Sequence, residues 1–545
     1  MTSSRPRRAD WLGALITGAV LVAVMTYPTA TQLGSYGRID TGDGRYSIWN
    51  IGWIDHALLT DPRRLLDANI FYPHTGVLAY SELNLVAGVL GLPVYAATHN
   101  AIAALNAAIL IALLAAFVLM WALVRMLTGS SGAGLCAATG FTFCPYVQAH
   151  TPHIQLLMVF ALPLVFVAFH RFHESPTAGR AAALGGALAL AGLACAYYGI
   201  FAGLALGAIA LLFAEKRRNY WLGLAAAAVV TALVVAPVFV PYLRARAQVS
   251  AVRTTNIEEL RGYSATPKSY ITSPSYIHEE VRDRARLFTP APESLFPGVA
   301  LTLLAFAGAV ATFRSGDRRE RRIVAAYLAL AVAACWASFG PDAGLYKWLQ
   351  AAVPAMGLLR APVRLGVVVT FAIAVLAGFG ARRLVGTRRW APALVVPLMA
   401  LELATLPWPL VPAERVPDAY RLLASAPRGA VVEFPFMYKR TDFHNHSRYM
   451  FTSIYHWQPL VNGYSDVIPP DFYELAGPIN AFPDPASFAL MRRLDVRYVI
   501  WHMDPRSYDA PAREKLLARF ARYPDNLRRL TTDEDVWLFE IVAWP

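Results

Sequence analysis

The chain has 545 residues, of which 56% are hydrophobic and only 16% are charged. Apolar residues recur in runs of about twenty, the length that crosses the hydrocarbon core of a bilayer, and this pattern excludes a soluble protein. The formal net charge of +13 does not indicate nucleic-acid binding, because the arginines and lysines lie in short clusters between the apolar runs, where the positive-inside rule places them.

The apolar runs predict an α-helical polytopic membrane protein with about eleven transmembrane helices. A further run at 83–97 is predicted to be interfacial or re-entrant, because the later basic clusters then lie on the same side as the N-terminal arginines. We therefore expect a cytoplasmic N-terminus and an extracytoplasmic C-terminus in the plasma (inner) membrane. The predicted crossings are approximately 11–30, 101–124, 132–147, 154–169, 181–197, 199–214, 220–241, 296–313, 323–339, 363–381 and 390–410.

This topology predicts sizeable outer segments at 31–100, 242–295 and 340–362. A group of prolines between 407 and 417 marks a linker, so the membrane module is predicted at 1–410 and a soluble outer domain at 411–545. Strand and helix patterns alternate in the outer domain, which is typical of a small α/β fold. Strands are expected at 430–434, 497–501 and 536–540, and helices near 486–494 and 511–522.

Two carboxylates, Asp40 and Asp43, follow the first crossing closely and precede a segment with Trp49 that is predicted to be a membrane-surface helix. A carboxylate at the membrane–water boundary can take a proton from an acceptor hydroxyl or bind a divalent ion, while a lipid carries the other substrate in from the bilayer. The alternative is a simple turn, because Thr-Gly-Asp-Gly is favourable turn chemistry and Asp43 can cap the following helix.

Further candidates for substrate binding are polar and aromatic side chains of the first outer segment, namely Arg45, Trp49, Tyr72, His74 and Glu82. Aromatic rings beside polar groups suit sugar rings, although a packed Pro-Gly turn explains this loop equally well. His153 lies between two predicted crossings at their outer end. Pairing with His150 in a helical metal site is disfavoured because Pro152 lies between them.

Arg360 and Arg364 lie where the third outer segment meets the start of the next crossing helix. The guanidinium group matches phosphate oxygens in geometry and charge, so these two residues are candidates for binding a donor phosphate. The alternative is ordinary anchoring at the lipid headgroups. No metal ligands are assigned, and Mg²⁺ or Mn²⁺ near the acidic first segment is left open.

The order of parts resembles the GT-C superfamily of membrane glycosyltransferases: a first helix, an acidic first outer loop with membrane-surface helices, many further crossings and an outer soluble domain. Some stretches look like those of poorly characterised bacterial cell-envelope proteins placed in that superfamily. They include Gly42-Asp43-Gly44, Asn69-Ile70-Phe71-Tyr72-Pro73-His74, Phe143-Cys144-Pro145-Tyr146, Arg360-Ala361-Pro362-Val363-Arg364 and Leu494-Asp495-Val496-Arg497-Tyr498-Val499.

The resemblance implies an inverting hexosyl or pentosyl transfer from a polyprenyl-phosphate sugar donor to a glycan, lipid or protein acceptor on the extracytoplasmic face. It assigns the base to Asp43, with Asp40 in reserve, and cationic groups to the donor phosphate. The chain has D-x-x-D where metal-dependent members have D-x-D, which weakens the expectation of a divalent ion.

The rival hypothesis is a transporter or flippase of a lipid-linked or anionic molecule. Such a protein needs polar residues deep inside the crossings, and Asn106 and Glu402 are nearly the only ones here. A third hypothesis is a non-catalytic scaffold whose outer domain binds a partner. The sequence does not name the sugar or the acceptor.

Overall fold

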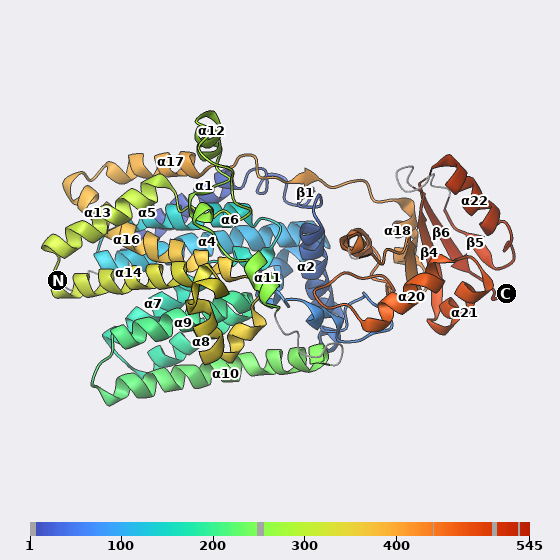
Figure 1. Ribbon diagram of the computed structural model, residues 1–545, viewed down its shortest axis with the longest axis horizontal. Coiled ribbons are helices and arrows are strands. Elements are labelled where there is room, and N and C mark those ends of the chain that lie inside the picture. The colour runs from blue at the N-terminus through green and yellow to red at the C-terminus, as the bar shows by residue number, and fades with distance from the viewer. Residues whose placement is uncertain (1–6, 248–255, 440, 504–508, 532–534) are drawn as a thin grey trace.

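The computed structural model covers residues 1–545 and describes residues 7–247, 256–439, 441–503, 509–531 and 535–545. Residues 248–255 of the predicted outer segment 242–295 therefore lie outside the described residues. Figure 1 shows a body of helices that run roughly along the long axis, with a smaller domain containing a sheet at one end. The C-terminus lies in the smaller domain (Figure 1).

Apolar composition explains the helical body. Within the described residues, six helical segments are long and apolar enough to cross a membrane, and five further apolar helices are shorter. The helices of this body are α1 (Arg8–Met25), α3 (Leu85–Thr98), α4 (Ala101–Thr128), α5 (Ser131–Thr142), α7 (Ala161–Glu174), α8 (Ala178–Ala194), α9 (Ala196–Leu212), α10 (Arg218–Ala247), α13 (Val299–Ser315), α14 (Arg318–Ser338), α16 (Gly366–Thr387) and α17 (Ala391–Leu403).

Polar contacts bring the basic ends of several helices together. Asp10 at the start of α1 lies 3.2 Å from Arg125 at the end of α4, so these two helices run antiparallel. Arg322 at the start of α14 donates to the carbonyl oxygen of Leu212 at the end of α9, at 2.7 Å. The start of α1 and the end of α4 therefore lie at one end of the helical body, and the end of α1 and the start of α4 lie at the other. The chain between these two helices begins and ends on the same side, so it makes no net crossing of the body.

The segment between α1 and α4 contains α2 (Gly42–Thr60), which crosses the end of the helical body nearly at right angles to the other helices (Figure 1). The side chain of Thr41 caps this helix by accepting the backbone N–H of Gly44 at 3.1 Å. Ile48, Trp49 and Ile51 are fully buried. The following helix α3 is short and contains Pro93, and it packs against α2 and α4.

Short helical segments join these elements: η1 (Pro62–Arg64), η2 (Val77–Tyr80), α6 (Pro145–Ala149), η3 (Ile154–Leu157), α11 (Ile257–Gly262), η4 (Pro267–Ile271), α12 (Tyr276–Arg284), η5 (Pro341–Ala343), α15 (Leu345–Ala352), η6 (Pro354–Leu358) and η7 (Pro362–Leu365). A two-stranded antiparallel ladder of β1 (Tyr36–Gly37) and β2 (Val411–Pro412) joins the end of the first crossing region to the start of the outer domain.

The outer domain is built on a four-stranded sheet in the order β3-β4-β6-β5. β3 and β4 are parallel and the other neighbours are antiparallel. The three strands predicted from the sequence are present, and β5 is an additional short strand. The elements are α18 (Asp418–Ser425), β3 (Ala430–Phe434), η8 (Phe443–Asn445), α19 (His446–Ser453), α20 (Pro470–Asn480), α21 (Pro485–Arg493), β4 (Val496–His502), α22 (Ala510–Phe520), β5 (Leu527–Arg529) and β6 (Val536–Ile541).

Aromatic side chains pack one face of this sheet. The ring of Phe434 on β3 stacks on Trp501 of the neighbouring β4, with ring centroids 4.2 Å apart. Phe520 of α22 lies 5.3 Å from Trp501 and stacks on Phe539 of β6 at 4.6 Å. Each ring buries a large apolar area, so α22 is fixed on this face of the sheet.

Backbone hydrogen bonds fasten the outer domain to the first outer segment. The N–H of Phe71 donates to the carbonyl oxygen of Asn462 at 3.0 Å, and the N–H of Tyr72 donates to that of Leu460 at 2.9 Å. The side chain of Asn69 accepts the indole N–H of Trp49 at 3.0 Å and donates to the hydroxyl of Ser453. The domain is thus docked on α2 rather than only tethered by the linker.

Candidate active site

A cavity of about 1080 Å³ lies between the helical body and the outer domain. Its walls come from segments far apart in the sequence that meet at this end of the body. These segments are the start of α2, the turn at 81–84, the turn at 150–155, the 192–197 junction between α8 and α9, the end of α10, the 357–364 segment and the 464–468 loop of the outer domain.

Asp43 and His153 are in contact at the wall of this cavity. The carboxylate Oδ2 of Asp43 lies 3.4 Å from Nε2 of His153, and the Asp43 side chain keeps 53% of its surface exposed. Asp43 lies in the first turn of α2 because Gly44 packs directly against the preceding loop. A Cβ atom at Gly44 would lie 1.9 Å from the carbonyl oxygen of Arg38, so only glycine permits this approach.

The electrostatic surroundings keep Asp43 ionised. The His153 imidazole beside it lowers the pKa of the Asp43 carboxyl below its usual value, partly opposed by burial, and Arg360 and Arg364 act in the same direction as His153. At Glu293 burial is the larger effect and raises the pKa of the carboxyl, although Arg364 and His153 oppose it. Asp43 is therefore a carboxylate at neutral pH, exposed enough to meet a substrate.

Two guanidinium groups lie in the same cavity. Nη1 of Arg360 is 3.2 Å from Oδ1 of Asp466 of the outer domain. Arg364 lies over the ring of Tyr197 at 4.3 Å, and within the described residues it forms no ion pair with a carboxylate. The Tyr197 hydroxyl also accepts the backbone N–H of Arg360 at 3.1 Å, so one side chain from the start of α9 positions both arginines.

A second pair, His150 and Glu293, lies deeper in the cavity, with Nε2 of His150 3.6 Å from Oε2 of Glu293. Burial lowers the pKa of His150 to about 3, so its imidazole is neutral. Among the described residues, no group of three or more His, Cys, Asp or Glu side chains could hold a metal ion. The two His–acid pairs are neighbours, with the rings of His150 and His153 6.1 Å apart.

No family model and no curated protein matches the chain. Among solved structures, it is similar to the archaeal oligosaccharyltransferase AglB from Archaeoglobus fulgidus, in complex with an inhibitory peptide and a dolichol-phosphate. The TM-score is 0.52 at 13% identity, over 91% of this chain and 70% of that chain. The chain has the GT-C fold.

A second solved structure is ArnT from Cupriavidus metallidurans bound to undecaprenyl phosphate. Its TM-score is 0.38 at 12% identity, over 98% of this chain and 99% of that chain. The fold that the sequence resemblance predicts is thus confirmed by the similarity to AglB. That similarity covers most of the chain.

Four of the residues predicted from the sequence as site residues line the cavity of this GT-C fold together with Asp43: Glu82, His153, Arg360 and Arg364. Asp40 does not line it. Its carboxylate is held by the guanidinium of Arg38, with Nε 3.0 Å from Oδ1 and Nη2 3.2 Å from Oδ2. Asp40 therefore neutralises a structural arginine instead of facing the cavity.

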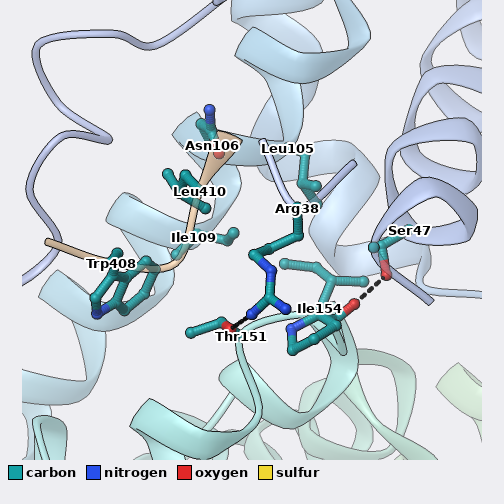
Figure 2. Close-up of a pocket in the computed structure, with 11 residues that line it drawn as sticks. Arg38, Ser47, Leu105, Asn106, Ile109, Thr151, Ile154, Trp408 and Leu410 are labelled. Carbon is teal, nitrogen blue, oxygen red and sulfur yellow. Dashed lines mark hydrogen bonds between the residues drawn. The ribbon is translucent and has the colours of Figure 1, made fainter. Parts of the chain in front are cut away.

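Arg38 ties the start of α2 to the turn that carries His153. Figure 2 shows its guanidinium pointing at Thr151, whose hydroxyl accepts a hydrogen bond of 2.5 Å from Nη1. In the same view the Ser47 hydroxyl donates to the carbonyl oxygen of Pro152 at 2.7 Å. These bonds fix the turn at 150–155 against α2, and so hold His153 beside Asp43.

The remaining predicted residues lie outside the cavity. Trp49 is fully buried, so its ring supports α2 and is not available to a substrate. His74 pairs with Asp471 of α20 at 3.0 Å and helps to dock the outer domain. Tyr72 is bonded through its backbone to the same domain, and Arg45 is half-buried on α2.

Sequence reasoning did not assign Glu293 or the residues that the outer domain contributes, such as Asp466 and Tyr464. Glu293 follows a Pro-Ala-Pro sequence, which indicates a loop and gives no sign of function. The outer-domain residues become part of the site only through the docking of that domain on α2.

Proposed function

We propose that the chain is a membrane glycosyltransferase. It would move a sugar, a hexose or a pentose, from a polyprenyl-phosphate-linked donor to an acceptor on the extracytoplasmic face of the plasma membrane, with inversion at the anomeric carbon. The observation that carries this proposal is the cavity in which an exposed, ionised Asp43 faces the same space as Arg360 and Arg364. The dolichol-phosphate in the AglB complex supports a lipid-linked donor.

The donor phosphate would bind between Arg360 and Arg364, because guanidinium groups pair with phosphate oxygens through charge-assisted hydrogen bonds. Helix α9 adds to this site. It begins at the cavity, so the partial positive charge of its N-terminus favours an anion bound there.

The lipid chain of the donor would enter beside α10. This helix lies along the edge of the helical body (Figure 1) and exposes large apolar side chains, including Leu233 at 68%. Val238, Phe239 and Leu243 near its end line the cavity. An apolar surface thus leads from the bilayer to the arginines, which is the path that a polyprenyl phosphate needs.

In the proposed reaction Asp43 takes the proton of the acceptor hydroxyl as its oxygen attacks the anomeric carbon. The bond between that carbon and the phosphate oxygen breaks, and the phosphate leaves with the electron pair, stabilised by Arg360 and Arg364. A single displacement inverts the anomeric configuration. His153 would orient the Asp43 carboxylate and stabilise its ionised form.

We also propose eleven crossings, in which α3 does not span the bilayer and α5 does. The basic ends grouped by the Asp10–Arg125 and Arg322–Leu212 contacts would then face the cytoplasm. The cavity and the outer domain would lie on the extracytoplasmic side. In this arrangement residues 1–410 form the membrane module and residues 411–545 the outer domain.

The deep polar residues favour a transferase over a transporter. The amide of Asn106 donates to the carbonyl oxygens of Leu33 and Tyr36, both at 2.8 Å. The carboxylate of Glu402 accepts backbone N–H groups at the start of α13 and lies 3.1 Å from His278. Both side chains are engaged in structural hydrogen bonds and are not placed as an ion relay.

The test is transfer of a radiolabelled sugar from a panel of polyprenyl-phosphate sugars in membranes that contain matched amounts of wild type, Asp43→Asn or Asp40→Asn. We expect transfer by the wild type, loss in Asp43→Asn and retention in Asp40→Asn, because only Asp43 faces the cavity. Movement of the labelled lipid between leaflets without transfer, or full activity of Asp43→Asn, would contradict the proposal.

A further inference from the structure

A row of aromatic side chains leads away from Asp43 along the outer domain. It begins with Tyr46, which lies three residues after Asp43 and therefore on the same side of α2. The ring of Tyr46 lies 6.3 Å from Tyr464, Tyr464 lies 6.0 Å from Phe443, and Phe443 stacks at 6.4 Å on Tyr473. All four residues line the cavity, but Phe443 is only 4% exposed, so its ring supports those of Tyr464 and Tyr473 and offers little surface of its own.

The inner end of this row lies within the electrostatic influence of Asp43. Burial raises the pKa of the Tyr464 phenol to about 12, and the Asp43 carboxylate is the largest contribution from a neighbouring charge. The outer end is open to solvent, because 47% of Tyr473 is exposed. A ligand lying along the row would therefore place one end at Asp43 and the other at the mouth of the cavity.

Polar groups accompany these rings. His444 and Ser465 line the cavity beside the row, and the tyrosines add their hydroxyl groups. Sugar rings combine weakly polar faces, which stack on aromatic rings, with a rim of hydroxyls that form hydrogen bonds. A lipid chain would require a continuous apolar wall. An anionic headgroup on this side would meet Asp43 and Asp466, whose charges disfavour it.

The size of the cavity also leaves room for a second ligand. Its volume of about 1080 Å³ exceeds the roughly 300–1,000 Å³ typical of sites for one small molecule. The arginines and the end of α10 occupy one side, where the donor phosphate and its lipid are proposed to bind. The aromatic row lines the side that belongs to the outer domain.

We infer that Tyr46, Tyr464 and Tyr473, with Phe443 supporting the rings from behind, form the acceptor subsite, and that it binds an oligosaccharide of at least two sugar units. The terminal sugar presents its hydroxyl to Asp43, and the next units stack toward Tyr473. This inference rests on the proposed function and narrows its acceptor from a glycan, lipid or protein to a glycan.

The subsite is tested by binding, without any donor. Purified full-length protein in detergent is titrated with mannose, glucose, galactose and arabinose oligosaccharides of two to six units, and with the corresponding monosaccharides. The variants are Tyr473→Ala, Tyr473→Phe and, as a matched control in the same domain, Tyr438→Ala. Tyr438 is 49% exposed, close to the value for Tyr473, and does not line the cavity.

We expect at least one oligosaccharide series to bind more tightly than its monosaccharide. Tyr473→Ala should weaken that binding about tenfold, the loss expected for one stacked ring, while Tyr473→Phe and Tyr438→Ala bind as the wild type does. The inference is overturned if no oligosaccharide binds at millimolar concentration, or if Tyr473→Ala binds unchanged.

Binding and transfer separate the two proposals. Oligosaccharide binding that depends on Tyr473, in a protein that transfers no sugar from any donor, would leave the subsite standing and contradict the transferase. Sugar transfer to a lipid or peptide acceptor that is unaffected by Tyr473→Ala would leave the transferase standing and overturn the glycan subsite.

Discussion

Asp466 competes with the donor phosphate for Arg360 if the phosphate binds where we propose. The two side chains are 34% and 30% exposed, and their charged atoms lie 3.2 Å apart. The interaction free energy of a pair this accessible is about 1 kcal/mol. A phosphate that binds Arg360 must break its contact with Asp466. Removing the charge in Asp466→Asn should therefore tighten phosphate binding about fivefold.

The substitution should leave the loop in place. Oδ2 of Asp466 accepts a hydrogen bond of 3.0 Å from the hydroxyl of Ser81, and the asparagine amide oxygen can accept the same bond. The assay is calorimetric titration of the purified protein with undecaprenyl phosphate at low and high salt. We expect the gain in affinity to be larger at low salt, because screening weakens the original pair.

Asp471→Asn is the matched control for this prediction. Asp471 is hydrogen-bonded to His74 at 3.0 Å, a contact between the same two parts of the molecule that lies outside the cavity. The dissociation constant of this variant for undecaprenyl phosphate should equal that of the wild type. Equal or weaker binding by Asp466→Asn would refute the assignment of Arg360 to the donor phosphate.

Three further predictions concern the same cavity. Arg364→Gln should raise the donor KM roughly tenfold to a hundredfold by removing a charged hydrogen bond, with the acceptor KM unchanged in steady-state kinetics. The pKa of Asp43 is lowered by His153, so kcat/KM should hold as pH falls through the range in which an ordinary aspartate is protonated, and His153→Ala should move this acidic limb to higher pH; an unmoved limb would exclude the pairing. Gly44→Ala should lower the melting temperature and abolish transfer, because its Cβ meets a backbone oxygen, whereas Gly42→Ala, whose Cβ would meet its nearest atom at 3.6 Å, should be tolerated.

Much of the fold follows from local patterns in the sequence. Long apolar runs predict the helices, and short runs rich in β-branched and aromatic residues predict strands β3, β4 and β6, since both signals depend on neighbouring residues. β5 has only three residues, Leu527–Arg529, two of them charged, so it carries no such signal. The docking of Phe71 and Tyr72 on the outer domain is made by backbone atoms, which sequence patterns do not reveal.

The candidate site was predicted in part because topology limits which segments can meet. Asp43, His153 and the Arg360–Arg364 stretch lie at the outer ends of different predicted crossings, and the positive-inside rule places those ends on one face. The sequence does not tell which of Asp40 and Asp43 faces the cavity. That depends on the contact of Asp40 with Arg38 and on the direction in which α2 leaves the loop. The contributions of Tyr464 and Tyr473 depend on tertiary docking, and no local signal marks them.

The central claim is that Asp43 activates an acceptor for displacement of a lipid-linked phosphate. It is tested most directly by incubating the purified chain with a polyprenyl-phosphate sugar of known anomeric configuration and determining the configuration of the product by NMR, for the wild type and Asp43→Asn. The account predicts an inverted product from the wild type and none from Asp43→Asn. A product with retained configuration, or an equal rate in the variant, would contradict it.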